Sequence, residues 1–101
     1  NKVQLLEQIL SEYDIDFLCI TEHWMSEDEL NEYLLINDRL LVSNFCRTTI
    51  GHGGTAIYSR YSSQQVKVNQ AINSLSVELD CDLCCVEVVD LDLVLVKVYR
   101  S

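Results

Sequence analysis

Ile15-Asp16-Phe17-Leu18-Cys19-Ile20-Thr21-Glu22-His23-Trp24 is the segment from which the architecture of this chain can be predicted. Its apolar part, residues 17–20, has the near-continuous hydrophobicity of a strand covered on both faces. The run ends abruptly at the carboxylate of Glu22. Ligands of open α/β sheets bind in the crevice beyond the carboxyl ends of the strands, so we expect Glu22 to take part in chemistry.

Residues 3–13 predict an amphipathic helix that leads into this strand. Apolar side chains recur there at intervals of three and four residues, with polar side chains between them. A helix followed by a buried strand is half of an α/β crossover unit, so we expect an α/β fold. A chain of 101 residues has room for one domain at most.

The rest of the sequence predicts a short helix and five strands. Ser26-Glu27-Asp28-Glu29 has the pattern of a capping box and begins a helix that ends near Leu34. Residues 61–74 predict a loop, and Val89-Asp90-Leu91-Asp92 predicts the connection of a hairpin. Cys84, Val86 and Val88 should share one face of their strand. The expected strands are residues 40–46, 55–59, 75–79, 83–89 and 93–99.

Net charge, cysteine content and hydropathy bear on nucleic-acid binding, on the cellular compartment, and on zinc and membrane binding. A net charge of −9 argues against non-specific attraction to a polyanion, so a nucleic-acid role must rest on local sites. The five cysteines are odd in number and mostly lie in apolar segments, which favours free thiols in a reducing, intracellular compartment. Cys81 and Cys84 form a lone Cys-x-x-Cys. A structural zinc site needs a second pair of ligands at short spacing, which the sequence lacks, so we do not expect one. No apolar stretch is long enough for a membrane helix, so we expect no membrane partner.

All three glycines of the chain fall in the loop of residues 47–54. Such clustering means that the backbone turns with positive φ or comes close to another group. The signatures of phosphate-binding loops are missing, because no Gly-Lys-Ser/Thr follows. Arg47 and Arg60 flank this region and are candidate contacts to DNA phosphate, with ordinary surface solvation as the competing interpretation.

Two further features have a structural and a functional interpretation. Trp24 could stack on nucleic-acid bases, but an isolated Trp beside a core strand is more often a packing anchor, and we prefer packing. The acids of residues 27–29 could bind a metal ion, but acids in a first helical turn are usually solvated and favoured by the helix dipole. We therefore expect neither feature to carry the chemistry.

Several motifs in order along the chain point to one family. They are Asn1-Lys2 before the first helix, the segment of residues 15–24, Gly-Gly-Thr-Ala-Ile-Tyr at 53–58, Cys-Cys-Val-Glu at 84–87 and Val-Tyr-Arg-Ser at 98–101. In this combination the chain resembles the N-terminal part of the endonuclease/exonuclease/phosphatase superfamily. The resemblance is greatest to the apurinic-type endonuclease domain of non-LTR retrotransposons, and it spans essentially the whole chain.

The resemblance implies a four-layer α/β sandwich, of which residues 1–101 would be about half, a partial domain truncated at both ends. It implies Mg²⁺-dependent phosphodiester cleavage. Glu22 matches the metal-binding Glu of the family, and a carboxylate suits a hard cation. Tyr99 matches the catalytic Tyr of the Y-x-P segment beside the scissile phosphate. The Gly-Asp-x-Asn and Ser-Asp-His motifs of the family have no counterpart here, and neither His23 nor His52 is carried over.

We therefore expect a fragment of a DNA endonuclease from a retrotransposon-derived protein with reverse transcriptase, inactive by itself. Its complete form would nick target DNA to prime reverse transcription, and a DNA target would imply the nucleus. One alternative is a phosphatase branch of the same superfamily. Another is a non-catalytic relic or a domesticated protein-interaction module, because an incomplete sandwich exposes sheet edges and an apolar face that favour self-association.

Overall fold

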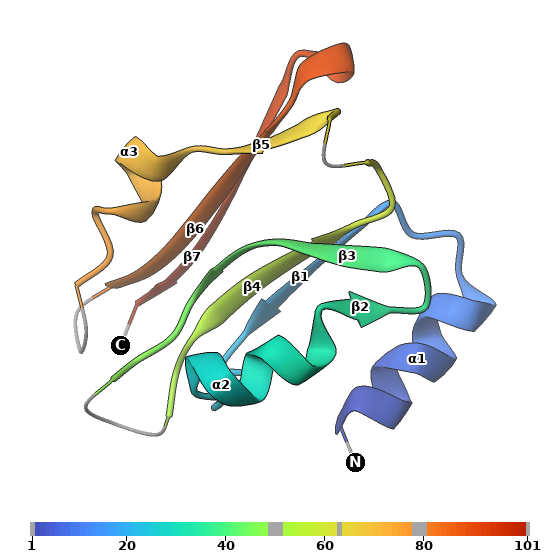
Figure 1. Cartoon of the computed structure of the whole chain (residues 1–101), viewed down its shortest axis with the longest axis horizontal. Coiled ribbons are helices and arrows are strands. Elements are labelled where there is room, and N and C mark those ends of the chain that lie inside the picture. Colours follow the sequence, from blue (N-terminus) through green and yellow to red (C-terminus); the bar gives the residue numbers. More distant parts are fainter. Residues whose placement is uncertain (1, 49–51, 63, 78–80, 101) are drawn as a thin grey trace.

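Two antiparallel sheets face each other in the computed structural model, which describes residues 2–48, 52–62, 64–77 and 81–100 (Figure 1). The first sheet has the strand order β1-β4-β3-β2 and the second has the order β5-β6-β7. With helices added to the two sheets, the chain has the expected α/β character. The elements are α1 (Lys2–Glu12), β1 (Phe17–Thr21), α2 (Glu27–Leu30), η1 (Asn31–Tyr33), β2 (Leu35–Ile36), β3 (Arg39–Phe45), β4 (Thr55–Ser59), β5 (Val66–Val68), α3 (Gln70–Asn73), β6 (Cys81–Val88), η2 (Val89–Leu91) and β7 (Leu93–Arg100).

β4 is the strand around which the first sheet is built. All of its five residues are buried, because β1 and β3 flank it and both of its faces are covered. Ile57 points between the sheets and packs with the second sheet, whereas Ala56 and Tyr58 point to the other face, where Leu10 of α1 joins them. The sandwich therefore has one core between its sheets and a second core beneath α1.

The strand at residues 17–20 is confirmed, but the prediction that it is covered on both faces is wrong. β1 runs antiparallel to β4, with Phe17 opposite Ser59 and Thr21 opposite Thr55. β4 is its one strand partner among the described residues, and the Cys19 side chain is exposed. Cys19 is exposed and the other four residues of β1 are only partly buried, so the face that carries Cys19 is incompletely covered.

The predicted helix starts are confirmed. α1 covers nearly all of the predicted range. At α2 the Ser26 hydroxyl accepts a hydrogen bond from the Glu29 N–H at 3.2 Å, and the Glu29 carboxylate accepts one from the Ser26 N–H at 3.2 Å. This reciprocal pair is the capping box that the sequence predicted. Across the described ranges, no helix is long and apolar enough to cross a membrane.

The second sheet carries the predicted hairpin. β6 and β7 pair along their whole length, from Cys81 opposite Arg100 to Val88 opposite Leu93. The expected alternation is confirmed, since Cys84, Val86 and Val88 are buried between the sheets and Glu87 is exposed. On the outer side of β7 a row of valines is about half exposed, which leaves an apolar face there: Val94, Val96 and Val98.

Three short elements were not predicted, and one predicted strand is wrong. β2 and β3 form a hairpin whose turn residues, Asn37 and Asp38, have φ values of 44° and 65°. β5 and α3 lie inside the predicted loop of residues 61–74. In place of a strand at residues 75–79, Val77 makes one isolated bridge to Cys81, because Leu75 belongs to the turn that ends α3. Residues 78 and 79 lie outside the described residues.

Candidate functional site

Glu22 directly follows β1 and is held there by the glycine loop. Its backbone has φ 54°, a left-handed conformation that is costly for a residue with a Cβ, and its N–H donates to the Gly54 carbonyl at 2.7 Å. Trp24 repeats the arrangement with φ 60° and an N–H that donates to the Gly53 carbonyl at 2.9 Å. These two bonds offset the strained backbone, and they leave the Glu22 carboxylate exposed to solvent.

Gly53 and Gly54 are required by close approach as well as by backbone conformation. Their φ values are 83° and 93°. A Cβ added to Gly54 would collide with the His23 ring, and one added to Gly53 would collide with the Arg47 guanidinium, both well inside 3.0 Å. The prediction that this loop turns with positive φ is thus confirmed at two glycines. Gly51 lies outside the described residues.

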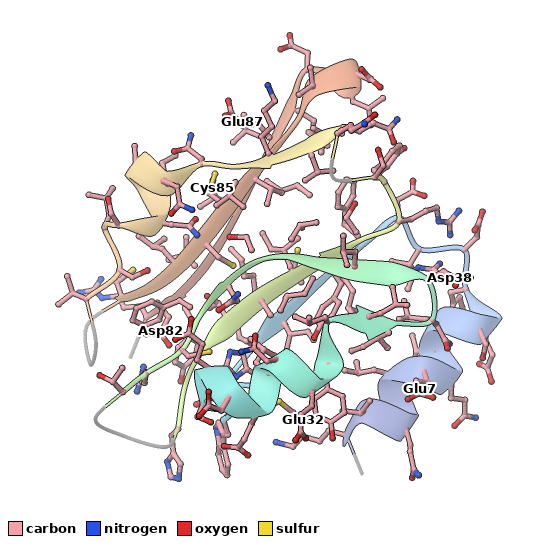
Figure 2. The ribbon with its side chains drawn as sticks, in the orientation of Figure 1. Glu7, Glu32, Asp38, Asp82, Cys85 and Glu87 are labelled. Carbon is pink, nitrogen blue, oxygen red and sulfur yellow. The ribbon has the colours of Figure 1, made fainter. Side chains whose placement is uncertain are left out.

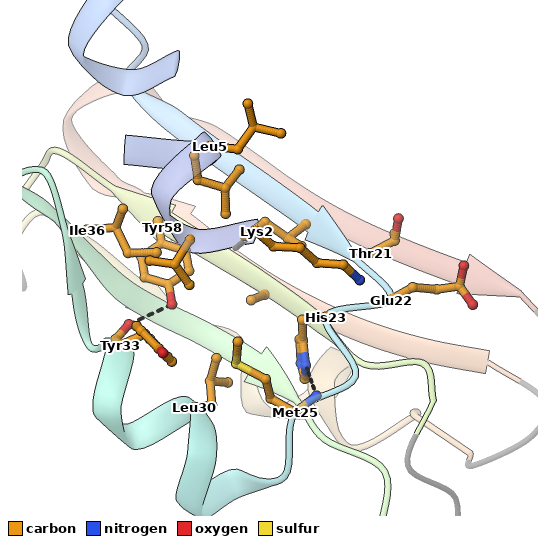
Figure 3. A pocket seen from close by; sticks show the side chains of 14 residues that line it. Lys2, Leu5, Thr21, Glu22, His23, Met25, Leu30, Tyr33, Ile36 and Tyr58 are labelled. Carbon is orange, nitrogen blue, oxygen red and sulfur yellow. Dashed lines mark hydrogen bonds between the residues drawn. The ribbon is translucent and has the colours of Figure 1, made fainter. Parts of the chain in front are cut away.

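His23 joins the end of β1 to the end of β3. The Met25 N–H donates to its Nδ1 at 3.0 Å, so the ring proton lies on Nε2, which donates to the Phe45 carbonyl at 3.2 Å (Figure 3). Burial lowers the pKa of His23, and the bond to Phe45 and the nearby charge of Asp82 oppose that effect only in part. The neutral His23 ring uses both nitrogens in hydrogen bonds to the backbone, so its role is to connect the ends of β1 and β3.

The unfolding free energy should fall as the pH drops through the range where unfolded His titrates. The pKa of His23 is lowered in the fold, so its contribution is complete above the unfolded value of 6.5 and is lost as the pH falls below it. Cys46, whose Sγ lies 3.9 Å from His23 Nε2, stays neutral throughout, since burial raises its pKa to about 11. Urea unfolding at about pH 7.5 and about pH 5.5 measures this loss.

The substitution His23→Gln should flatten this pH dependence, because it removes the titrating ring. His52→Gln is the matched control, since His52 is the other His of the chain and is exposed. An unchanged pH dependence in His23→Gln would contradict the assignment to His23.

Asp82 belongs to the candidate site and was not predicted from the sequence. Its carboxylate is fully buried, and both of its oxygens lie 3.2 Å from Arg47 Nε. The Gly54 N–H also donates to Asp82 Oδ2, at 2.8 Å. Asp82 points from β6 toward the ends of β3 and β4, whereas Glu87 on the same strand points outward (Figure 2). Through Gly54, Asp82 fixes the loop that in turn fixes Glu22.

The structure brings Tyr99 to Glu22. The Glu22 carboxylate lies close enough to the Tyr99 hydroxyl to raise the pKa of Tyr99, and partial burial adds to that effect. The Arg47 guanidinium lies over the Tyr99 ring, with Cζ 6.0 Å from the ring centroid, and so links Tyr99 to Asp82. Glu22, just after β1, and Tyr99 of β7 are distant in sequence, and they form one polar cluster with Arg47 and Asp82.

Arg60 lies at the other end of β4, away from this cluster. It pairs with Asp14 and, at 3.4 Å, with Asp16, and it donates to the Ile15 carbonyl at 3.1 Å. Arg47 is nearly buried, with its side chain 7% exposed, and is paired with Asp82. The structure thus separates the two arginines, and the prediction that they contact DNA stays untested.

Trp24 is not the core anchor that we expected. Its side chain is 49% exposed, and its ring stacks on His52 with centroids 4.2 Å apart and an interplanar angle of 17°. The left-handed backbone at Trp24 turns the chain away from the core side of β1, which explains why the packing prediction failed. The sequence gives no sign of such a turn, since Trp rarely adopts positive φ.

A largely apolar cavity of 320 Å³ lies beneath α1, next to Glu22 (Figure 3). Lys2, Glu22 and His23 line one end, and apolar side chains such as Leu6 and Ile36 line the rest. Glu22 supplies the one carboxylate among the lining residues. The cavity therefore adds no second carboxylate beside Glu22.

Among the described residues, no group of three or more His, Cys, Asp or Glu side chains could hold a metal ion. Asp82 is committed to Arg47 and Gly54, and the acids of residues 27–29 are exposed on α2. Mg²⁺ is commonly bound through one or two carboxylates, with water and substrate phosphate as its other ligands. An exposed Glu22 beside a Tyr hydroxyl fits one protein ligand of that kind.

A scan against protein-family models gives a match to the Endonuclease/Exonuclease/phosphatase family over residues 1–96. The chain belongs to this family. Membership in the Endonuclease/Exonuclease/phosphatase family indicates hydrolysis of the nuclease or phosphatase type, and its members commonly use divalent metal ions. Comparisons with curated proteins and with solved structures gave no match. The finer resemblance to retrotransposon endonucleases remains a prediction.

Proposed function

We propose that this chain is part of a Mg²⁺-dependent DNA endonuclease domain of a retrotransposon-derived protein. In the complete protein the domain would hydrolyse a phosphodiester bond and nick target DNA for reverse transcription. The observation that carries the proposal is the polar cluster at one end of the sandwich, where Glu22 at the end of β1 lies near Tyr99 of β7 and the Arg47–Asp82 ion pair. Family membership supports the hydrolase class.

Each residue of the cluster has a distinct proposed part. Glu22 would be a ligand of the Mg²⁺ ion, which stabilises developing negative charge on phosphate when it is bound. The Tyr99 hydroxyl would donate a hydrogen bond to a phosphate oxygen of the substrate. Arg47 holds the Tyr99 ring in place, and Asp82 holds both Arg47 and the glycine loop.

In this proposal the chain is a partial domain. The Gly-Asp-x-Asn and Ser-Asp-His motifs, which by resemblance orient the attacking water, do not occur in the 101 residues. We therefore expect these residues alone to leave supercoiled plasmid DNA intact in the presence of Mg²⁺. Robust nicking by the isolated chain would contradict the view that those motifs are required.

In the complete parent protein, Glu22→Gln should lower Mg²⁺-dependent nicking by more than about 100-fold, because a neutral amide is a poor ligand for a hard cation. Conversion of supercoiled plasmid to open circles measures the effect. Glu27→Gln is the matched control, since it removes an exposed carboxylate from the first turn of α2. Full activity of Glu22→Gln would overturn the role of Glu22.

A second candidate function is protein interaction, which the exposed Val94, Val96 and Val98 favour. A relic or domesticated module could self-associate through that face. Size-exclusion chromatography that shows a stable monomer would count against it.

The phosphatase branch of the family is distinguished by comparing turnover of DNA with that of inositol phosphates. A DNA substrate would place the complete protein in the nucleus.

A further inference from the structure

Lys2, Trp24 and His52 form an exposed column next to Glu22, which we call the Trp24 stack. Trp24 and His52 are nearly parallel, with ring centroids 4.2 Å apart, and Lys2 Nζ lies 4.7 Å from the centroid of the Trp24 ring. Lys2 reaches from the first turn of α1 toward the end of β1, where Glu22 lies (Figure 3). The column combines two aromatic faces with one cation.

The backbone of Trp24 is held by its own contacts, and its ring packs on His52 and Lys2 rather than in the core. The Trp24 N–H donates to the Gly53 carbonyl at 2.9 Å, and φ is 60°, yet the side chain is 49% exposed. A strained backbone that presents a large ring to solvent is more typical of a binding surface than of a core anchor. Trp24 is also only two residues from Glu22, within reach of a nucleotide whose phosphate lies there.

We propose that the Trp24 stack binds a nucleobase of single-stranded DNA adjacent to the phosphate at Glu22. The inference rests on the proposed nuclease function and names a base-binding residue for it. Bases stack on aromatic side chains whatever their identity, and the Lys2 ammonium can move from the ring to the neighbouring phosphate.

The competing explanation is that the stack only joins three segments of the fold. Lys2 belongs to α1, Trp24 follows β1 and His52 belongs to the glycine loop. A purely structural stack would be insensitive to DNA and would not distinguish a base from an abasic site. These two consequences can be measured on this chain alone.

Trp24 is the only tryptophan of the chain, so its fluorescence reports on the stack directly. The chain is titrated at low ionic strength, in EDTA so that no cleavage occurs, with an oligothymidylate and with an abasic sugar-phosphate oligomer of the same length. We expect saturable quenching by the oligothymidylate and little by the abasic oligomer. Equal quenching by both, or none by either, would overturn the proposal.

Variants separate binding from folding. His52→Ala and Trp24→Leu should each weaken binding of a fluorescein-labelled oligothymidylate by at least about fivefold, measured by anisotropy. Tyr13→Ala is the matched control, because Tyr13 is an exposed aromatic residue just beyond the other end of α1. Circular dichroism verifies that each variant is folded. Unchanged binding by both folded stack variants would overturn the proposal.

Failure of this inference can be told apart from failure of the proposed function. Glu22→Gln should retain the quenching of Trp24, because base stacking needs no metal ligand. Base-dependent quenching without nicking by the complete parent protein would leave the stack in place and refute the endonuclease. Nicking without base-dependent quenching would support the endonuclease and refute base binding by the Trp24 stack.

Discussion

Replacing Asp82 with alanine should lower the unfolding free energy by about 3–5 kcal/mol, which is the usual result of removing one partner of a buried ion pair. Asp82 is fully buried and the Arg47 side chain is only 7% exposed, so the variant removes the Asp82 carboxylate from a nearly buried guanidinium. The Gly54 N–H loses its acceptor at the same time. Both losses fall on the groups that hold Glu22 in place.

Urea unfolding of the Asp82→Ala variant at neutral pH measures this effect. Glu87→Ala is the matched control, because Glu87 is an exposed acid on the same strand and its loss should change stability by no more than about 0.5 kcal/mol. Asp82→Asn should lose an amount of unfolding free energy between those of Asp82→Ala and Glu87→Ala, since the amide keeps the size and one acceptor but removes the charge. A loss below about 1 kcal/mol in Asp82→Ala would show that the Arg47 pair is solvated in solution.

Gly54→Ala should destabilise the protein by about 2–5 kcal/mol. The left-handed conformation costs a residue with a Cβ about 1–2 kcal/mol, and overpacking against a fixed neighbour adds about 1–3 kcal/mol. The neighbour is the His23 ring, which cannot move aside without breaking its hydrogen bonds to Phe45 and Met25. Urea unfolding measures the total.

A double-mutant cycle separates the two contributions. In a His23→Ala background the ring is gone, so Gly54→Ala should cost only the conformational part, which leaves a coupling of about 1–3 kcal/mol. Gly54→Ala with the same cost in both backgrounds would show that the ring and the added methyl do not meet. In that case the strain would lie in the backbone alone.

Regular elements of the fold were predictable where a pattern was long enough to be read. β4 has the predicted bounds, Thr55–Ser59, and the β6–β7 hairpin appears where alternating residues indicated it. β2 has two residues and α3 has four, too few to show a period. The hairpin turn between β2 and β3 did have a signal, because Asn37 and Asp38 are residue types that tolerate positive φ.

The candidate site was predictable only in part. Glu22 follows from its place at a strand end, and Tyr99 came from family resemblance alone. Asp82 shares its face of β6 with Cys84 and Val86, and that parity was a readable sign that it is buried. It was missed because the predicted strand began at residue 83, two residues after the observed start of β6, so Asp82 was placed in the preceding connection. No local pattern could show that Arg47 pairs with it, since that contact depends on how the two sheets meet.

The contacts that position Glu22 join parts of the chain that are far apart in sequence. The Asp82–Gly54 hydrogen bond spans 28 residues and the Asp82–Arg47 pair spans 35. Closing such long loops costs chain entropy before the contacts repay it, and folds rich in distant pairings form slowly. A minimal peptide cut around Glu22 would therefore lack the geometry of the site, and any miniaturised version must keep β1, the glycine loop, β6 and β7 together.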